Sequence, residues 1–175
     1  LYDLILKSLV AYHAERSIEE KIKTLCSGAK VLAEKKLVSQ AICIIEKAKE
    51  ICTKYERFDQ FFEVLSWEYE LMTFEEEEEK LYRLADSNRA ESHALAEKYL
   101  NLSDYRHRIR YLTPLIRKQS LVRDEVSMEK FRELTHAPLF QDESRALSHE
   151  ARLVYAFVHY NYHIQKGEWE KALPF

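Results

Sequence analysis

Glycine and proline are scarce in this chain, whose 175 residues include only 2 glycines and 3 prolines. Sheets and long loops use these two residues at their turns far more often than helices do. Apolar side chains make up 46% of the sequence and recur at the spacing of a helix face, as Leu1, Leu4, Ile5 and Leu9 do near the start. The sequence therefore predicts an all-α fold of antiparallel helix pairs.

Composition limits the function classes that fit this chain. The formal net charge of -3 gives no overall positive field, which a protein usually needs to attract nucleic acids or anionic membranes. Cys26, Cys43 and Cys52 are odd in number and form no CxxC pair, which favours small buried thiols in a reducing compartment. No stretch approaches the ~18 apolar residues of a membrane span. We therefore expect a soluble cytoplasmic protein without a membrane segment.

The two ends of the sequence suggest a piece of a longer chain. It begins at Leu1 instead of a methionine, and residues 172–175 follow the start of a new helical pattern. We expect this sequence to be a fragment.

Periodicity and capping residues predict about 7–8 helices. Ser17 and Glu20 have the spacing of a capping box, in which each side chain binds a free backbone N–H. Pro114 either kinks a helix or begins a new one. The predicted helices cover 1–16, 18–35, a segment from 37, 58–72, a segment from the acidic run 75–79 to 100, a segment after a break at 101–104, 124–135 and 143–166.

Two segments resemble tetratricopeptide repeats, which are helix pairs of about 34 residues with small side chains where the helices touch. The first, 22–55, places Ala29 and Ala41 at such contacts; the second, 153–173, has Gly167, Trp169 and Ala172 at the turn. The chain as a whole resembles bacterial proteins with divergent repeats of this type. The resemblance implies one helical-repeat domain over 1–175, a right-handed solenoid that is divergent in its middle. It departs from the family at the first turn, where Lys36 replaces the usual glycine.

Candidate chemical sites are few. His159 and His163 have the i, i+4 spacing of a helical metal pair, but without a third ligand the preferred interpretation is aromatic packing. Arg106, Arg108 and Arg110 alternate with aromatic residues as in an RNA-binding strip, against which a solvated helix face is preferred. The sequence has no nucleophile elbow or phosphate-binding glycine loop. We predict no enzymatic activity, no cofactor and no metal.

The aromatic residues near the end of the sequence, at Tyr155, Phe157, Tyr160, Tyr162 and Trp169, are expected to be core residues because aromatic stripes at helical spacing usually are.

The resemblance implies a protein-interaction scaffold that binds a peptide or helix in a concave groove. If the repeat geometry holds, Lys23, Lys30, Phe157 and Asn161 face that groove. Phe157 stands where carboxylate-clamp members of the family carry lysine, so recognition of an acidic chain terminus is not expected. The alternative is a regulatory or sensor module that controls an attached effector domain, or a helical repeat that binds RNA or DNA. The partner and the oligomeric state are not predicted.

Overall fold

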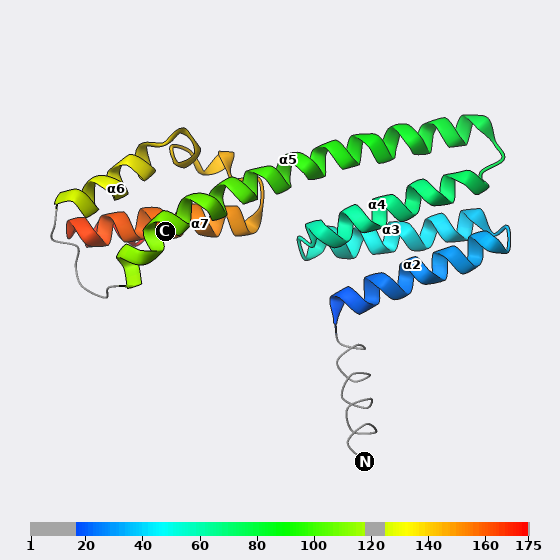
Figure 1. Cartoon of the computed structure of the whole chain (residues 1–175), viewed down its shortest axis with the longest axis horizontal. Helices are drawn as coiled ribbons and strands as arrows, with labels where there is room; N and C mark the ends of the chain where they lie inside the picture. The colour runs from blue at the N-terminus through cyan, green and yellow to red at the C-terminus, as the bar shows by residue number, and fades with distance from the viewer. Residues whose placement is uncertain (1–16, 118–124, 175) are drawn as a thin grey trace, which may run out of the picture. The chain divides into compact units, whose positions relative to one another are not determined.

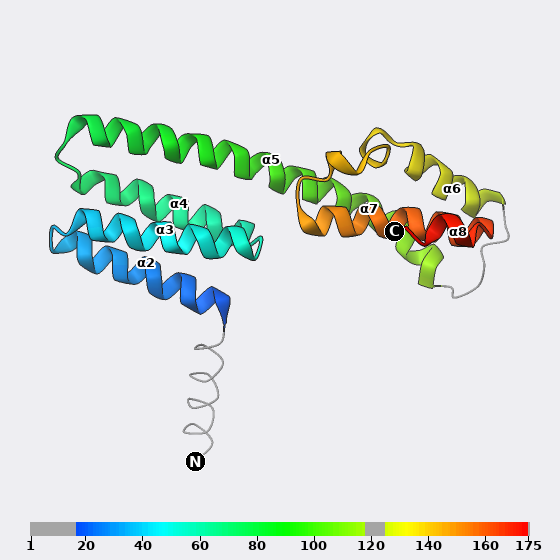
Figure 2. The ribbon, with the colours of Figure 1, turned by 180° about the vertical axis from the view of Figure 1, so that it is seen from behind.

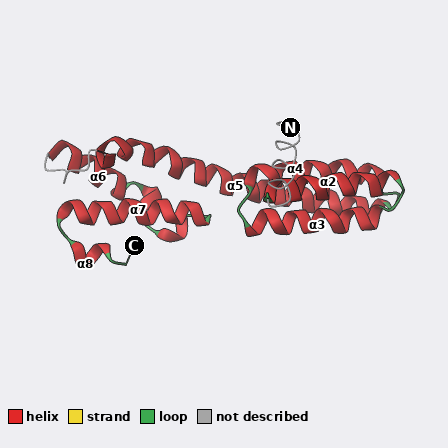
Figure 3. Ribbon diagram, turned by 90° about the horizontal axis from the view of Figure 1, so that it is seen from below, coloured by secondary structure: helices red, strands yellow, loops and turns green. Residues whose placement is uncertain are grey.

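The structure, a computed structural model, describes residues 17–117 and 125–174, and every regular element in these ranges is helical (Figures 1 and 3). This confirms the all-α class for the part of the chain that is described. The helix predicted over 1–16 lies outside it. The chain divides into two compact units at residues 95 and 96, and each unit is described by itself. One repeat domain over 1–175, stacked as a solenoid, stays a prediction.

The first unit contains the predicted helices at 18–35, from 37 and over 58–72. Its elements are α2 (Ile18–Glu34), α3 (Val38–Lys54), α4 (Phe58–Leu71), the short 3-10 helix η1 (Met72–Phe74) and the first part of α5 (Glu78–Arg117). Each helix of the series α2, α3 and α4 runs antiparallel to the one before it (Figure 1). The acidic run opens α5 as predicted, with Glu78 and Glu79 in its first turn, where the helix dipole favours negative charge.

Small side chains line the contact between α2 and α3. Ala29 and Ala41 are both fully buried, as the sequence predicts. Alanine at these positions lets two backbones approach closely, whereas a larger side chain would push them apart. The surrounding core consists of Ile22, Cys26, Ala33, Ile45, Ala48, Cys52, Val64 and Leu71.

The three cysteines differ in exposure. Cys26 and Cys52 are buried, and burial raises the pKa of each thiol to about 11. Cys43 is exposed on α3, so the prediction of buried thiols is wrong for this residue. Its place between the buried Ala41 and Ile45 puts it on the solvent side of the helix.

Two turns of the first unit use a left-handed residue that is not glycine. At the end of α2, Lys36 has φ 61°, its N–H donates to the carbonyl of Ala33, and the next N–H donates to that of Leu32. These are the two bonds of a Schellman motif. The end of α3 repeats them around Glu56, which has φ 47°. The glycine missing from the repeat pattern is therefore replaced by a strained lysine in the same turn.

A buried polar network joins α3, α4 and α5. The ammonium of Lys49 lies 2.6 Å from Glu68 Oε1 and 3.0 Å from Glu91 Oε2. The amide nitrogen of Asn88 donates to Glu68 Oε2 at 2.8 Å and to the carbonyl of Leu65 at 2.9 Å. Burial acts to lower the pKa of Lys49, but its hydrogen bonds to Glu68 and Glu91 raise that pKa above its usual value. The network therefore holds a charged lysine inside the unit.

The second unit is built on the rest of α5. Its further elements are α6 (Glu125–His136), the 3-10 helices η2 (Pro138–Phe140) and η3 (Glu143–Arg145), α7 (His149–Lys166) and α8 (Trp169–Ala172), which follows α7 directly in Figure 2. The predicted helix at 124–135 is confirmed within one residue. The predicted helix at 143–166 begins later, at His149, where Ser148 is the N-cap and its hydroxyl accepts from Ala151 N–H.

The predicted break at 101–104 is wrong, because α5 continues through it. Asn101 looks like a turn residue in sequence, but its side chain binds a distant loop. The amide donates to the carbonyl of Arg145 at 2.9 Å, and its oxygen accepts from the N–H of Leu147 at 3.0 Å. This tertiary pairing satisfies the polar side chain without ending the helix.

Pro114 lies inside α5, which continues to Arg117, so it does not begin a new helix. Proline has no N–H, and one backbone hydrogen bond of the last turns is lost there.

The predicted capping box at the start of α2 is also wrong. Ser17 is the N-cap of α2, but its side chain makes no capping hydrogen bond.

Candidate functional site

An exposed apolar stripe runs along α7. Leu153, Phe157 and Tyr160 are 56%, 42% and 45% exposed and lie four and three residues apart, which places them on one face of the helix. The opposite side of α7 carries its buried residues, including Ala151, Val154 and Val158. Helix α7 thus has an apolar face against its own unit and a second apolar face toward solvent. We call Leu153, Phe157 and Tyr160 the α7 stripe.

The turn after α7 adds another exposed aromatic residue. Gly167 has φ 75° and ends α7 with the same pair of hydrogen bonds as the turns at Lys36 and Glu56. Glycine at this position confirms the predicted helix end. Beyond it, Ala172 is buried as predicted, whereas Trp169 is 60% exposed. The expectation that Phe157, Tyr160 and Trp169 are core residues is therefore wrong, while Tyr155 is buried.

Aromatic packing holds α7 in place within its unit. The ring of Phe140 lies 5.0 Å from Tyr105 and 6.4 Å from Tyr155, centroid to centroid. The hydroxyl of Tyr105 donates to the carbonyl of Leu139 at 2.6 Å, and burial raises the pKa of this phenol to about 12. The stripe is therefore presented on a helix whose other side packs through Tyr155 against the ring of Phe140.

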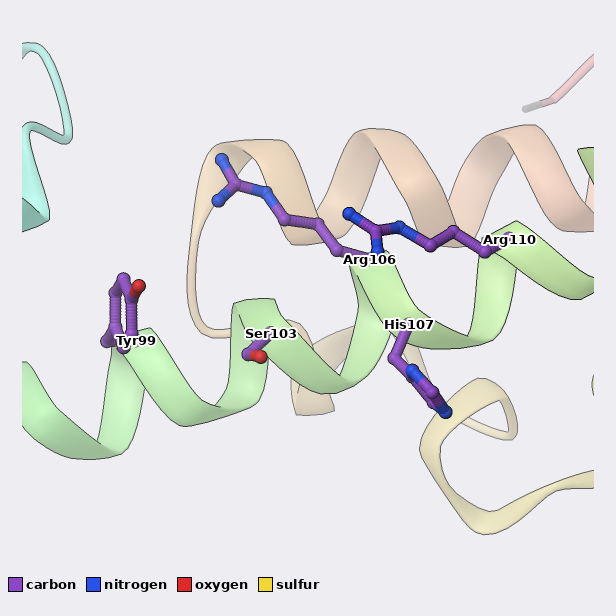
Figure 4. A pocket seen from close by; sticks show the side chains of 5 residues that line it. All are labelled: Tyr99, Ser103, Arg106, His107 and Arg110. Atoms are coloured by element: carbon purple, nitrogen blue, oxygen red, sulfur yellow. The ribbon is translucent and has the colours of Figure 1, made fainter.

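A cleft of about 220 Å³ lies on α5 in the same unit. Its walls are formed by Tyr99, Ser103, Arg106, His107 and Arg110 (Figure 4). The side chains of Arg106 and Arg110 extend on the side of α5 that faces α7, whereas His107 points to the other side. Among the residues that the structure describes, no aspartate or glutamate lines this cleft.

Arg106 is fixed by Glu150, the second residue of α7. Its Nε lies 2.6 Å from Glu150 Oε1, and its terminal nitrogen bonds the second carboxylate oxygen, so the pair is bidentate. The hydrogen bond to Arg106 lowers the pKa of Glu150, which keeps the carboxylate ionised. No hydrogen bond or ion pair of the Arg110 side chain is found among the described residues. Glu150 therefore neutralises one of the two arginines.

The predicted RNA-binding strip is divided between two sides of α5. Arg106 and Arg110 line one cleft together, as expected for a continuous helix. Arg108 lines a different cavity, of about 330 Å³, with Tyr111, Lys130 and Glu133. Arg117 also belongs to α5, but its side chain lies outside the described residues. The three arginines of the strip do not form a single binding face.

Each histidine of the predicted metal pair has its own protein partner. His159 Nε2 donates to the carbonyl of Phe140 at 2.8 Å, and its ring lies 4.4 Å from that of Tyr155. Burial lowers the pKa of His159, which favours its neutral form. His163 Nδ1 lies 2.9 Å from Glu168 Oε2. Within residues 17–117 and 125–174 no cluster of three histidine, cysteine or acidic residues could hold a metal ion.

The four residues of the predicted groove lie in separate units. Lys23 and Lys30 are exposed on α2, where Lys23 pairs with Glu20 at 3.4 Å and Lys30 lies 5.5 Å from the ring of Trp67. Phe157 belongs to the α7 stripe, and the Asn161 amide donates to the carbonyl of Phe157 at 2.7 Å. A single groove lined by all four residues stays a prediction.

Comparisons of this chain with known protein families, with curated proteins and with solved structures found no match. Across the described ranges, no helix combines the length and the apolar character that crossing a membrane requires. For the residues that the structure describes, the class is therefore all-α, and the tetratricopeptide resemblance stays a prediction.

Proposed function

We propose that this chain is a protein-interaction module that binds a helix of a partner protein along the α7 stripe. The exposure of Leu153, Phe157 and Tyr160 on one face carries this proposal. Single exposed apolar residues are common on protein surfaces, but a contiguous apolar patch is typical of a binding site. The spacing of four and three residues matches the anchors by which two helices pack against each other.

The residue types of the patch support the same function. Tyrosine and tryptophan are enriched among the residues that contribute most to binding energy at protein interfaces. Tyr160 of the stripe is exposed, and it is a large side chain with a polar group that water can reach. The rigid packing behind α7 limits the entropy that binding would cost.

For the test, the full chain is immobilised in its unchanged form and as two variants. The proteins that each retains from an extract of the source cells are then compared. Leu153→Glu with Phe157→Glu places two charges in the α7 stripe, and we expect it to lose at least one protein that the unchanged chain retains. The control is Tyr69→Glu with Tyr82→Glu, which changes two exposed aromatic residues of the first unit.

The control should retain the same proteins as the unchanged chain. All four replaced side chains are exposed, so both variants should keep the helical circular dichroism spectrum. Identical sets of retained proteins on the stripe variant and the unchanged chain would rule out this function for the stripe.

A further inference from the structure

We infer that the helix bound by the α7 stripe is acidic, with a carboxylate that docks against Arg110. This inference rests on the proposed function and adds the charge of the partner. It is carried by the position of the α5 cleft beside α7 and by the ion pair that compensates only one of its two arginines.

The positive charge of the α5 cleft comes from Arg106 and Arg110, because Arg108 lines a different cavity. Within the cleft, Glu150 binds Arg106 with both carboxylate oxygens, so that charge is largely compensated. No described residue compensates Arg110 in this way. The cleft therefore keeps a net positive charge that a partner can meet.

Helices α5 and α7 run in the same direction in this unit, and Arg110 follows Arg106 by one turn on the side of α5 that faces α7 (Figures 1 and 4). The contacts advance together along both segments, from Asn101 with Leu147 to Arg106 with Glu150. Each helix rises about 1.5 Å per residue. One turn beyond the Arg106 contact, Arg110 is therefore level with Leu153, the first residue of the stripe.

The surroundings of Arg110 suit a carboxylate on a partner helix. A guanidinium offers a planar fork of N–H donors that binds carboxylates in a bidentate manner. The Ser103 hydroxyl on the same cleft wall adds a further donor within the site. On α7 itself the other lysine and arginine side chains are Arg152 and Lys166, and Lys166 is already paired with Glu168 at 2.9 Å. An acidic amphipathic helix would thus meet apolar residues at the stripe and positive charge beside it.

The probe is a pair of synthetic amphipathic peptides of about 18 residues, or five helical turns. Both carry the same leucine face; one has glutamate on its flanks and the other has lysine. Fluorescence anisotropy with the full chain measures the two dissociation constants. We expect the glutamate peptide to bind at least tenfold more tightly than the lysine peptide, and Arg110→Glu to remove that preference.

A matched control is Arg132→Glu, which reverses an exposed arginine on α6 that pairs with Glu129 of its own helix. It should leave the tenfold preference unchanged. Equal binding of the two peptides, or a preference that survives Arg110→Glu, would overturn the acidic partner while leaving the stripe as a binding surface. If the Leu153→Glu, Phe157→Glu variant still binds both peptides, the proposed function is overturned instead. If the unchanged chain binds neither peptide, both the proposed function and the acidic partner are overturned.

Discussion

Lys49 shows how a charged residue specifies packing in the first unit. Its ammonium is buried among Glu68, Glu91 and the neighbouring Glu46, and Asn88 satisfies the second oxygen of Glu68. A buried ion pair is often no more stable than a well-packed apolar pair, but removing one partner leaves an uncompensated charge. The network therefore penalises any arrangement of α3, α4 and α5 that separates these residues.

We predict that Lys49→Met lowers the free energy of unfolding by about 3–5 kcal/mol, because it leaves Glu68 buried without its cation. Lys47→Met, at an exposed position of the same helix, should change it by about 0.5 kcal/mol or less. Adding Glu68→Gln to Lys49→Met should recover part of the loss. Urea unfolding followed by circular dichroism measures all three. Equal effects of the two lysine replacements would show that the network does not stabilise the unit.

Sequence reasoning missed this network for a physical reason. Lysine, glutamate and asparagine at helical spacing usually form a solvated face, and nothing local distinguishes the buried members. Ala29 and Ala41, by contrast, could be predicted because small residues within an apolar stripe mark a close helix contact. The burial of Tyr155 and the exposure of Tyr160 could not be predicted, since both have the same residue type on one helix.

At the scale of elements, three helices end in the same hydrogen-bonded turn with different residues. Lys36 and Glu56 adopt the left-handed conformation that glycine adopts without strain, and Gly167 adopts it at the end of α7. A side chain with a β-carbon costs about 1–2 kcal/mol in this region. The turn is therefore set by the hydrogen bonds and the helix packing around it, and the residue at its centre alters only its strain.

We predict that Lys36→Gly and Glu56→Gly each raise the free energy of unfolding by about 1 kcal/mol. Gly167→Ala should lower it by about 1 kcal/mol for the same reason. The matched control is Gly28→Ala in the middle of α2, where an added β-carbon would meet nothing within 4 Å. It should stabilise by about 0.5–1 kcal/mol, because alanine favours a helix interior. Thermal unfolding measures these changes, and effects of the same sign for both glycines would contradict this explanation.

Helix boundaries were predictable only where local signals determine them. The C-terminal ends of α2 and α7 follow from the sequence within one residue, whereas α7 begins six residues later than predicted. The continuous α5 does not, because Asn101 binds the backbone of residues 145 and 147, more than forty positions away. A local interpretation takes such an asparagine as part of a break between helices, since its distant partner is not visible in the sequence nearby.

At the scale of the whole molecule, the two units are stabilised in different ways. The first depends on small residues at the α2–α3 contact and on the buried Lys49 network. The second depends on packed rings around Phe140 and on side chains that bind loop backbone. Both units leave polar helix faces exposed, and the second unit also exposes the α7 stripe. The central claim is that this stripe is covered when the protein performs its function.

The most direct test places the photo-crosslinking residue p-benzoylphenylalanine at position 157 of the full chain in the source cells. The same residue at position 82, an exposed tyrosine of the first unit, is the control. The account predicts a discrete cross-linked product of higher mass from position 157 and none like it from position 82. No product from position 157, or the same products from both positions, would contradict it.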